Sequence, residues 1–173
     1  MTGSITIALD VMSGDNGPAP AILGSIKALQ SIDDLRVDLV GDQDIINQAL
    51  HSIDMSLRER ITIIHTKEFI KMDEDILSAI RNKKQSSMRL SINRVKNNEA
   101  HACVSAGNTG ALMSLSKIIL KTIDGIDRPA ICTSLPTKKK FMQVLDLGAN
   151  IECNAQNLYQ FAVMGSSVVK SLE

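Results

Sequence analysis

The chain has 173 residues, of which 44% are hydrophobic and 22% charged, a balance typical of a globular protein with a buried core. Its 19 basic and 19 acidic side chains cancel, and aromatic residues make up only 2% of the sequence, with no tryptophan. Nucleic acids are bound through net positive charge and through aromatic stacking platforms. The composition therefore argues against a nucleic-acid-binding module.

Metal binding and membrane insertion are not expected either. The three cysteines are widely spaced and form no CxxC pair, which is typical of a reducing compartment, and the three histidines form no cluster with zinc-ligand spacing. The N-terminus lacks the basic region of a signal peptide, and no apolar run approaches the roughly 18 residues of a membrane span. We expect an intracellular protein, soluble or at most peripherally associated with a membrane, without a zinc site.

Short β-branched runs alternate with stretches of helical periodicity along the chain. The first four strands are predicted at residues 5–9, 36–40, 61–64 and 102–104. A helix through Ile22, Ile26 and Leu29 separates the first two strands, and Asp42 is a candidate N-cap for the next helix. Two helices, 73–81 with Asp73 as its cap and 86–97, are predicted before the fourth strand.

The remainder of the chain continues this pattern with one exception. The helix after the fourth strand has a predicted buried stripe that consists of Ala111, Leu112, Leu115, Ile118 and Ile119. Strands near 130–135 and 141–147 are joined by the short turn Lys138–Lys140, which indicates an antiparallel hairpin. The last helix is expected to bury Leu158, Phe161, Ala162, Gly165 and Val168.

Alternating strands and helices predict an α/β fold with a mostly parallel sheet. No linker or repeat interrupts the sequence, so residues 1–173 are expected to form a single α/β domain. The chain stops at Glu173 directly after a helical pattern, and this ending is typical of a truncated chain, although a natural end is the alternative.

The loop from Ser105 to Gly110 is the strongest candidate for a ligand site. It follows a strand and precedes a helix, so the hydroxyls of Ser105 and Thr109 and the amides of Gly107 and Gly110 could bind an anion such as phosphate. The alternative is a tight turn in which Asn108 or Thr109 caps the helix. Cys103, just before this loop, is interpreted as a core residue rather than a nucleophile.

A second loop, from Asp10 to Gly17, follows the first strand. If that strand neighbours the fourth, both loops open into one crevice at the carboxyl edge of the sheet. Asp10 and Asp15 could then orient a ligand. The alternative is that these side chains only stabilise the turn through their own backbone.

A basic stretch without acidic residues spans 81–98. Within it Ser86, Ser87 and Arg89 begin a helix and could converge on an anion. The alternative is a solvated helix face, as most runs of charge are.

Five blocks in this order resemble the phosphate acyltransferase family of bacterial phospholipid synthesis: ALDVMSGDNGP, KKQSSMRLS, ACVSAGNTGAL, GIDRPAI and LDLGANIEC. The resemblance implies a Rossmann-like α/β/α sandwich related to isocitrate and isopropylmalate dehydrogenases. It implies a homodimer in the cytoplasm that associates peripherally with the membrane. The implied reaction transfers a fatty acyl group from acyl carrier protein to orthophosphate, without metal or cofactor.

The sequence departs from the family in two respects. Val11 and Ser13 stand where the family motif has alanine and the first of two glycines. Family members are also longer, so this chain corresponds to their N-terminal half, and such a half can be inactive by itself. A nicotinamide-dependent dehydrogenase of a related fold and a non-catalytic phosphate-binding module remain the alternative functions.

The loops and the resemblance together give the expected site. The residues expected to act in catalysis are Asn108, Asp10 and Asp15. The residues expected to bind phosphate or the acyl group are Ser86, Ser87, Arg89, Ser105, Gly107, Thr109, Gly110, Gly14 and Asn16. Lys83 and Lys84 are expected to dock the acidic carrier protein.

Overall fold

The computed structural model describes residues 3–150 and 152–172. The chain forms two compact units, Met1–Leu120 and Lys121–Glu173. Compact units of this kind can belong to one domain, so the expectation of a single domain over residues 1–173 stays a prediction. The elements of the first unit are β1 (Ile5–Asp10), α1 (Pro18–Ser31), β2 (Leu35–Gly41), α2 (Gln43–Ala49), α3 (Met55–Arg58), β3 (Ile61–His65), α4 (Ile76–Asn82), α5 (Ser87–Lys96), β4 (Ala102–Ser105) and α6 (Thr109–Leu120).

A four-stranded sheet organises the first unit. Its order is β3-β2-β1-β4, and all three strand pairs are parallel. β1 is therefore central, and its last residue, Asp10, lies in register with Val40 of β2 on one side and Ser105 of β4 on the other. The predicted mostly parallel α/β fold is confirmed, and so is the expected proximity of the first and fourth strands.

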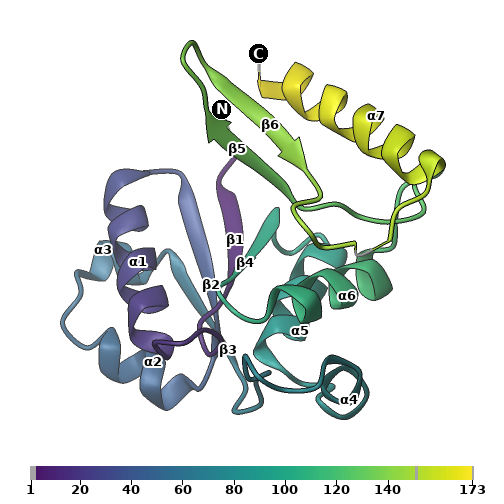
Figure 1. Ribbon diagram of the computed structural model, residues 1–173. Coiled ribbons are helices and arrows are strands. Elements are labelled where there is room, and N and C mark those ends of the chain that lie inside the picture. Colours follow the sequence, from purple (N-terminus) through teal and green to yellow (C-terminus); the bar gives the residue numbers. More distant parts are fainter. Residues whose placement is uncertain (1–2, 151, 173) are drawn as a thin grey trace. The chain divides into compact units, whose positions relative to one another are not determined.

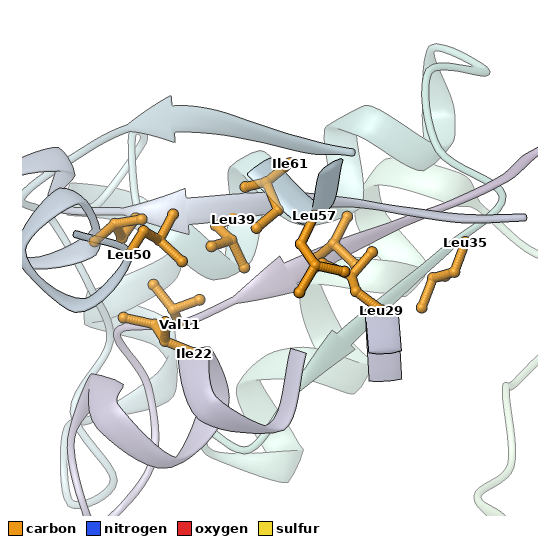
Figure 2. Packing of buried hydrophobic residues seen from close by; sticks show 10 residues of the cluster. Val11, Ile22, Leu29, Leu35, Leu39, Leu50, Leu57 and Ile61 are labelled. Atoms are coloured by element: carbon orange, nitrogen blue, oxygen red, sulfur yellow. The ribbon is translucent and has the colours of Figure 1, made fainter. Parts of the chain in front are cut away.

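Helices cover both faces of this sheet (Figure 1). One apolar cluster packs α1, α2 and α3 against the sheet and includes Ile22, Leu29, Leu39 and Leu57 (Figure 2). A second cluster joins α4, α5 and α6 through residues such as Met88, Ile92 and Leu115. Because side chains alternate along a strand, consecutive residues of β2 contribute to opposite faces of the sheet.

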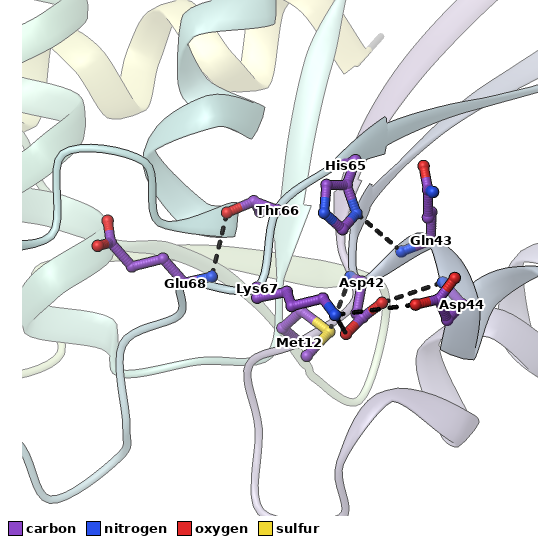
Figure 3. A network of polar contacts seen from close by, with 8 residues as sticks. All are labelled: Met12, Asp42, Gln43, Asp44, His65, Thr66, Lys67 and Glu68. Carbon is purple, nitrogen blue, oxygen red and sulfur yellow. Dashed lines mark hydrogen bonds and ion pairs between the residues drawn. The ribbon is translucent and has the colours of Figure 1, made fainter.

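The carboxyl edge of the sheet is filled by the protein's own groups over β2 and β3. Asp42 caps α2, because its carboxylate accepts from the Asp44 amide at 3.0 Å. The Lys67 ammonium lies 3.8 Å from the carboxylates of Asp42 and Asp44 (Figure 3). The Gln43 amide donates to His65 Nδ1 at 3.2 Å. The loops that follow β1 and β4 lie at the neighbouring part of this edge.

Three local expectations need correction. Asp75 rather than Asp73 caps α4, because its carboxylate accepts from the Ser78 amide at 2.8 Å. Ile118 is 56% exposed rather than buried, since the buried stripe of α6 consists of Ala111, Leu115 and Ile119. The short helix α3 falls where no helix was expected.

The second unit contains the hairpin β5 (Cys132–Pro136) and β6 (Phe141–Leu145) and the helix α7 (Ala155–Leu172). The two strands are antiparallel, as predicted. The Gln160 side chain of α7 donates to Asp127 at 2.9 Å and accepts from its amide at 3.0 Å. Phe161 is buried, whereas Leu158 and Ala162, both expected in the core, are exposed. Among the described residues no helix is long and apolar enough to cross a membrane.

A buried ion pair links β2 to α5. Asp38 is 3% exposed in its side chain and lies 2.8 Å from Arg94, which also pairs with Glu99 at 2.9 Å. Asp38→Ala leaves the guanidinium partly buried without its main partner, so we expect the free energy of unfolding to fall by about 3 kcal/mol. Glu99→Gln is the matched control at the exposed partner and should cost less than about 1 kcal/mol. Urea unfolding measures both, and equal losses would contradict this assignment.

Candidate functional site at the carboxyl edge of β1 and β4

A buried carboxylate joins the two loops that the sequence singled out. Asp10 is fully buried, and its Oδ2 accepts from the Ser105 hydroxyl at 2.8 Å. Its Oδ1 accepts from the amides of Met12 and Ser13, both at 3.3 Å. The Ser105 hydroxyl in turn accepts from the Gly107 amide at 3.1 Å. One carboxylate thus fixes the ends of both strands and the start of both loops.

The two loops are in direct contact. Gly14 has a φ of +113°, and a Cβ there would lie 3.3 Å from the Ala106 methyl, so a side chain would be both strained and crowded. A Cβ on Gly107 would lie 2.6 Å from Ser13 and 2.8 Å from Met88 of α5. Glycine at 107 is therefore required for close approach, and α5 reaches the same point as the β1 loop.

A groove of about 600 Å³ opens beside these loops on the α1 side of the sheet. Six residues of the two loops line one part of it: Asp10, Ser13, Gly14, Asp15, Asn16 and Ser105. All of them except Ser13 were expected site residues. Its other walls are apolar and come from α1 and from strands β1, β2 and β4. The structure therefore brings Asp10, Asp15, Asn16, Gly14 and Ser105 together.

The second half of the Ser105–Gly110 loop is used differently. Asn108 Oδ1 accepts from the Ala111 amide at 3.0 Å, and its Nδ2 donates to the Met72 carbonyl at 2.8 Å. A Cβ on Gly110 would lie 2.7 Å from the Ile76 side chain of α4. The groove is not lined by Asn108, Thr109 or Gly110. The side-chain oxygen of Asn108 caps α6, as the alternative interpretation of this loop predicted.

Three buried hydroxyls lie near these loops without a hydrogen-bond partner among the described residues. They belong to Ser13, Ser86 and Ser87, which are 2%, 0% and 0% exposed. Ser86 is the N-cap of α5 but makes no side-chain capping bond. A buried hydroxyl without a partner is costly, so each is an available donor for a ligand or an ordered water.

The basic residues of this region are largely engaged within the protein. Arg89 Nη2 donates to the Ile80 carbonyl at 2.8 Å, and exposed Lys84 contacts the same oxygen at 3.2 Å. Both side chains therefore bond to the C-terminal end of α4, but the Arg89 Nε is buried without a hydrogen-bond partner among the described residues. Lys83 bonds to Glu74 and to the Phe69 carbonyl, and its hydrogen bond lowers the pKa of the Glu74 carboxyl. Lys84 is the more accessible of the two lysines expected to dock a carrier.

Cys103 packs against the second apolar cluster. Burial raises the pKa of its thiol, which keeps it in the unreactive protonated form at neutral pH. This supports the interpretation of Cys103 as a core residue. Among residues 3–150 and 152–172, no group of three or more histidine, cysteine or acidic side chains could hold a metal ion.

Sequence reasoning missed the apolar part of the groove and the hydroxyl of Ser13. The signal for the groove was present in α1, where the residues that face it are small: Ala21, Gly24, Ser25 and Ala28. Their spacing of three, one and three residues places them on one helical face. This stripe indicates a groove only once α1 is known to lie over strands β1 and β4.

The chain is similar to known proteins over nearly its whole length. Residues 5–173 match the model of a family described as "Fatty acid synthesis protein". A phosphate acyltransferase from Nitrosococcus oceani is 48% identical over 170 residues, and one from Legionella pneumophila is 49% identical over 170 residues. A third, from Methylococcus capsulatus, is 46% identical over 168 residues. Each alignment covers 97–98% of this chain but 50% of the relative, so the chain spans about half the length of these curated relatives.

The role of Asn108 can be tested through stability. Asn108→Ala removes the cap of α6 and the bond to Met72, so the free energy of unfolding should fall by at least about 1 kcal/mol. Asn108→Asp keeps an acceptor for the Ala111 amide and should lose less. Urea unfolding of the two variants measures the difference. An alanine variant as stable as the wild type would show that the cap contributes nothing.

Proposed function

Because this chain belongs to the family described as fatty acid synthesis protein, we propose that it is the N-terminal half of a phosphate acyltransferase. The proposed reaction moves a fatty acyl group from acyl carrier protein to orthophosphate. Relatives at 46–49% identity carry the name phosphate acyltransferase. The structural observation that supports the proposal best is the set of buried hydroxyls without a hydrogen-bond partner among the described residues. Ser13 lines the groove, and Ser86 and Ser87 begin α5.

Phosphate is the ligand that these hydroxyls suit. Ser86 and Ser87 stand at the beginning of α5, where a helix favours negative charge through its amides and dipole. The next residue, Met88, reaches Gly107, and so does Ser13. In the proposed site, phosphate oxygens accept hydrogen bonds from Ser86 and Ser87, while Arg89 supplies positive charge nearby.

The reaction needs placement more than it needs an activated side chain. Orthophosphate is anionic at neutral pH and is itself the nucleophile. One of its oxygens forms a bond to the thioester carbonyl carbon, the carbon–sulfur bond breaks, and the carrier thiol leaves with the proton of hydrogen phosphate. The protein's part is to hold the two substrates together and to stabilise the oxyanion of the tetrahedral intermediate.

The two loops supply the groups that could meet this intermediate. Ser105 and Ala106 line the groove, and the Asp10 carboxylate holds Ser105 in place. Gly14 and Asn16, on the opposing loop, would bind the acyl carbonyl or phosphate, and Asp15 would orient them. Asn108, Gly107, Thr109 and Gly110 would act by fixing the loop and the start of α6, since the Asn108 amide is bonded within the protein.

Assembly and location belong to the same proposal and rest on the family resemblance. The whole protein is proposed to be a cytoplasmic homodimer that associates peripherally with the membrane. Light scattering of the full-length protein tests the dimer. Flotation with anionic phospholipid vesicles tests the association, and a monomer that stays with the soluble fraction would contradict both.

The decisive experiment combines the full-length protein with palmitoyl carrier protein, with and without orthophosphate. Acyl phosphate is trapped by hydroxylamine as the hydroxamate, and free carrier thiol is measured in parallel. We expect equal amounts of both products, and only when phosphate is present. Phosphate binding without acyl phosphate would instead favour a non-catalytic phosphate-binding module. A cofactor-dependent change in melting temperature on adding NAD would favour the dehydrogenase.

Carrier docking gives a separate prediction. Lys84 is exposed, whereas Lys83 is paired with Glu74, so charge reversal at Lys84 should weaken attraction to an acidic carrier. We expect Lys84→Glu to raise the KM for the carrier substrate about threefold at low salt, and less at high salt. Lys96→Glu, at another exposed position of the basic stretch, is the control. An unchanged KM for Lys84→Glu would remove this lysine from the docking surface.

A further inference from the structure

The groove exists because α1 presents small side chains to the sheet. Ala21, Gly24, Ser25 and Ala28 line it from the helix. An ideal Cβ placed on Gly24 would meet no atom within 4 Å, so the space next to this glycine is open. A helix that packs on a sheet ordinarily fills such positions with large apolar side chains. Here the open space next to α1 is part of the groove.

The opposite wall of the groove is a strip of the sheet. Ile7 and Leu9 of β1, Val37 of β2 and Val104 of β4 line it. Val104 is 52% exposed, although it lies in register with Leu9 of the central strand β1. A site of about 600 Å³ is within the range of roughly 300–1,000 Å³ in which proteins bind organic ligands. Apart from Asp10 and Asp15 of the β1 loop, its lining contains no charged side chain.

One end of the groove differs from the remainder. Asp10, Ser13 and Ser105 line this end. The Ser13 hydroxyl is buried, with the residue 2% exposed, and has no hydrogen-bond partner among the residues described. This hydroxyl is an observation independent of the small residues on α1, and it indicates that a polar group of a ligand belongs at this end.

We infer that the groove between α1 and the β1–β4 strip binds the fatty acyl chain of the substrate, with its carbonyl end at the Ser13 hydroxyl. This inference rests on the proposed function and adds to it the site that selects chain length. An apolar tail with one polar end matches a groove with apolar walls and one polar end. Because each methylene removed from water contributes to binding, the filled length of the groove sets the preferred chain.

Gly24→Leu tests the inference without threatening the fold. Leucine is a better helix former than glycine, and its side chain would enter the open space of the groove. Lys27→Leu is the matched control, because Lys27 is exposed on the same helix and does not line the groove. Both variants are made in the full-length protein, and kcat/KM is measured with octanoyl and palmitoyl carrier protein. Binding of cis-parinaric acid, a fluorescent fatty acid, is measured in parallel.

We expect Gly24→Leu to lower kcat/KM for palmitoyl carrier protein about tenfold and to leave that for octanoyl carrier protein within about twofold. Binding of cis-parinaric acid should weaken in this variant, and Lys27→Leu should resemble the wild type in every measurement. An unchanged chain-length preference with unchanged cis-parinaric acid binding would overturn the inference. So would an equal loss for both substrates together with altered unfolding, since another part of the protein would then fill the groove.

The two proposals fail in different ways. If the wild type forms no acyl phosphate, the proposed function is wrong. Binding of cis-parinaric acid that Gly24→Leu weakens would still support an apolar-chain site in the groove. If the wild type neither forms acyl phosphate nor binds this fatty acid, both proposals are overturned.

Discussion

The buried carboxylate of Asp10 is the interaction on which the remaining site depends. It accepts hydrogen bonds from the Ser105 hydroxyl and from the amides of Met12 and Ser13. A carboxylate excluded from water is stable only when such donors surround it. The same bonds that make Asp10 tolerable in the interior therefore determine where both loops begin, and they place the groove at the edge between β1 and β4.

Much of the fold was predictable because its strands and helices have strong apolar patterns. β-branched runs such as Ile61–Ile64 identify the parallel strands, and the stripe of Ile22, Ile26 and Leu29 identifies α1. Local competition limits such reasoning: Asp73 and Asp75 are both acceptable caps, and only the position of the Ser78 amide selects Asp75. The exposure of Ile118 likewise depends on which neighbouring helices pack against α6. The periodicity of one helix carries no information about those neighbours.

The site was predictable in a different way. Polar residues after two strands indicated the β1 and β4 loops, and their meeting follows from the strand order. The sequence does not reveal which polar atoms are already used within the protein. Asn108 and Lys83 have the chemistry of ligand-binding groups, yet their donors go to Met72 and Glu74. Arg89 gives one donor to the Ile80 carbonyl, whereas its buried Nε has no hydrogen-bond partner among the described residues. The groove itself results from side chains that are absent from α1, and small residues are a weak signal until their surroundings are known.

The bond between Asp10 and Ser105 joins residues 95 positions apart in the chain, and this separation has a consequence for biogenesis. β1 and β2 can pair early, because only one helix separates them. β1 has no β4 partner until residue 105 has left the ribosome, and closing so long a loop costs chain entropy. During synthesis the central strand therefore carries an unpaired edge, and Asp10 lacks its Ser105 donor. The nascent chain is most vulnerable to misassociation in that interval.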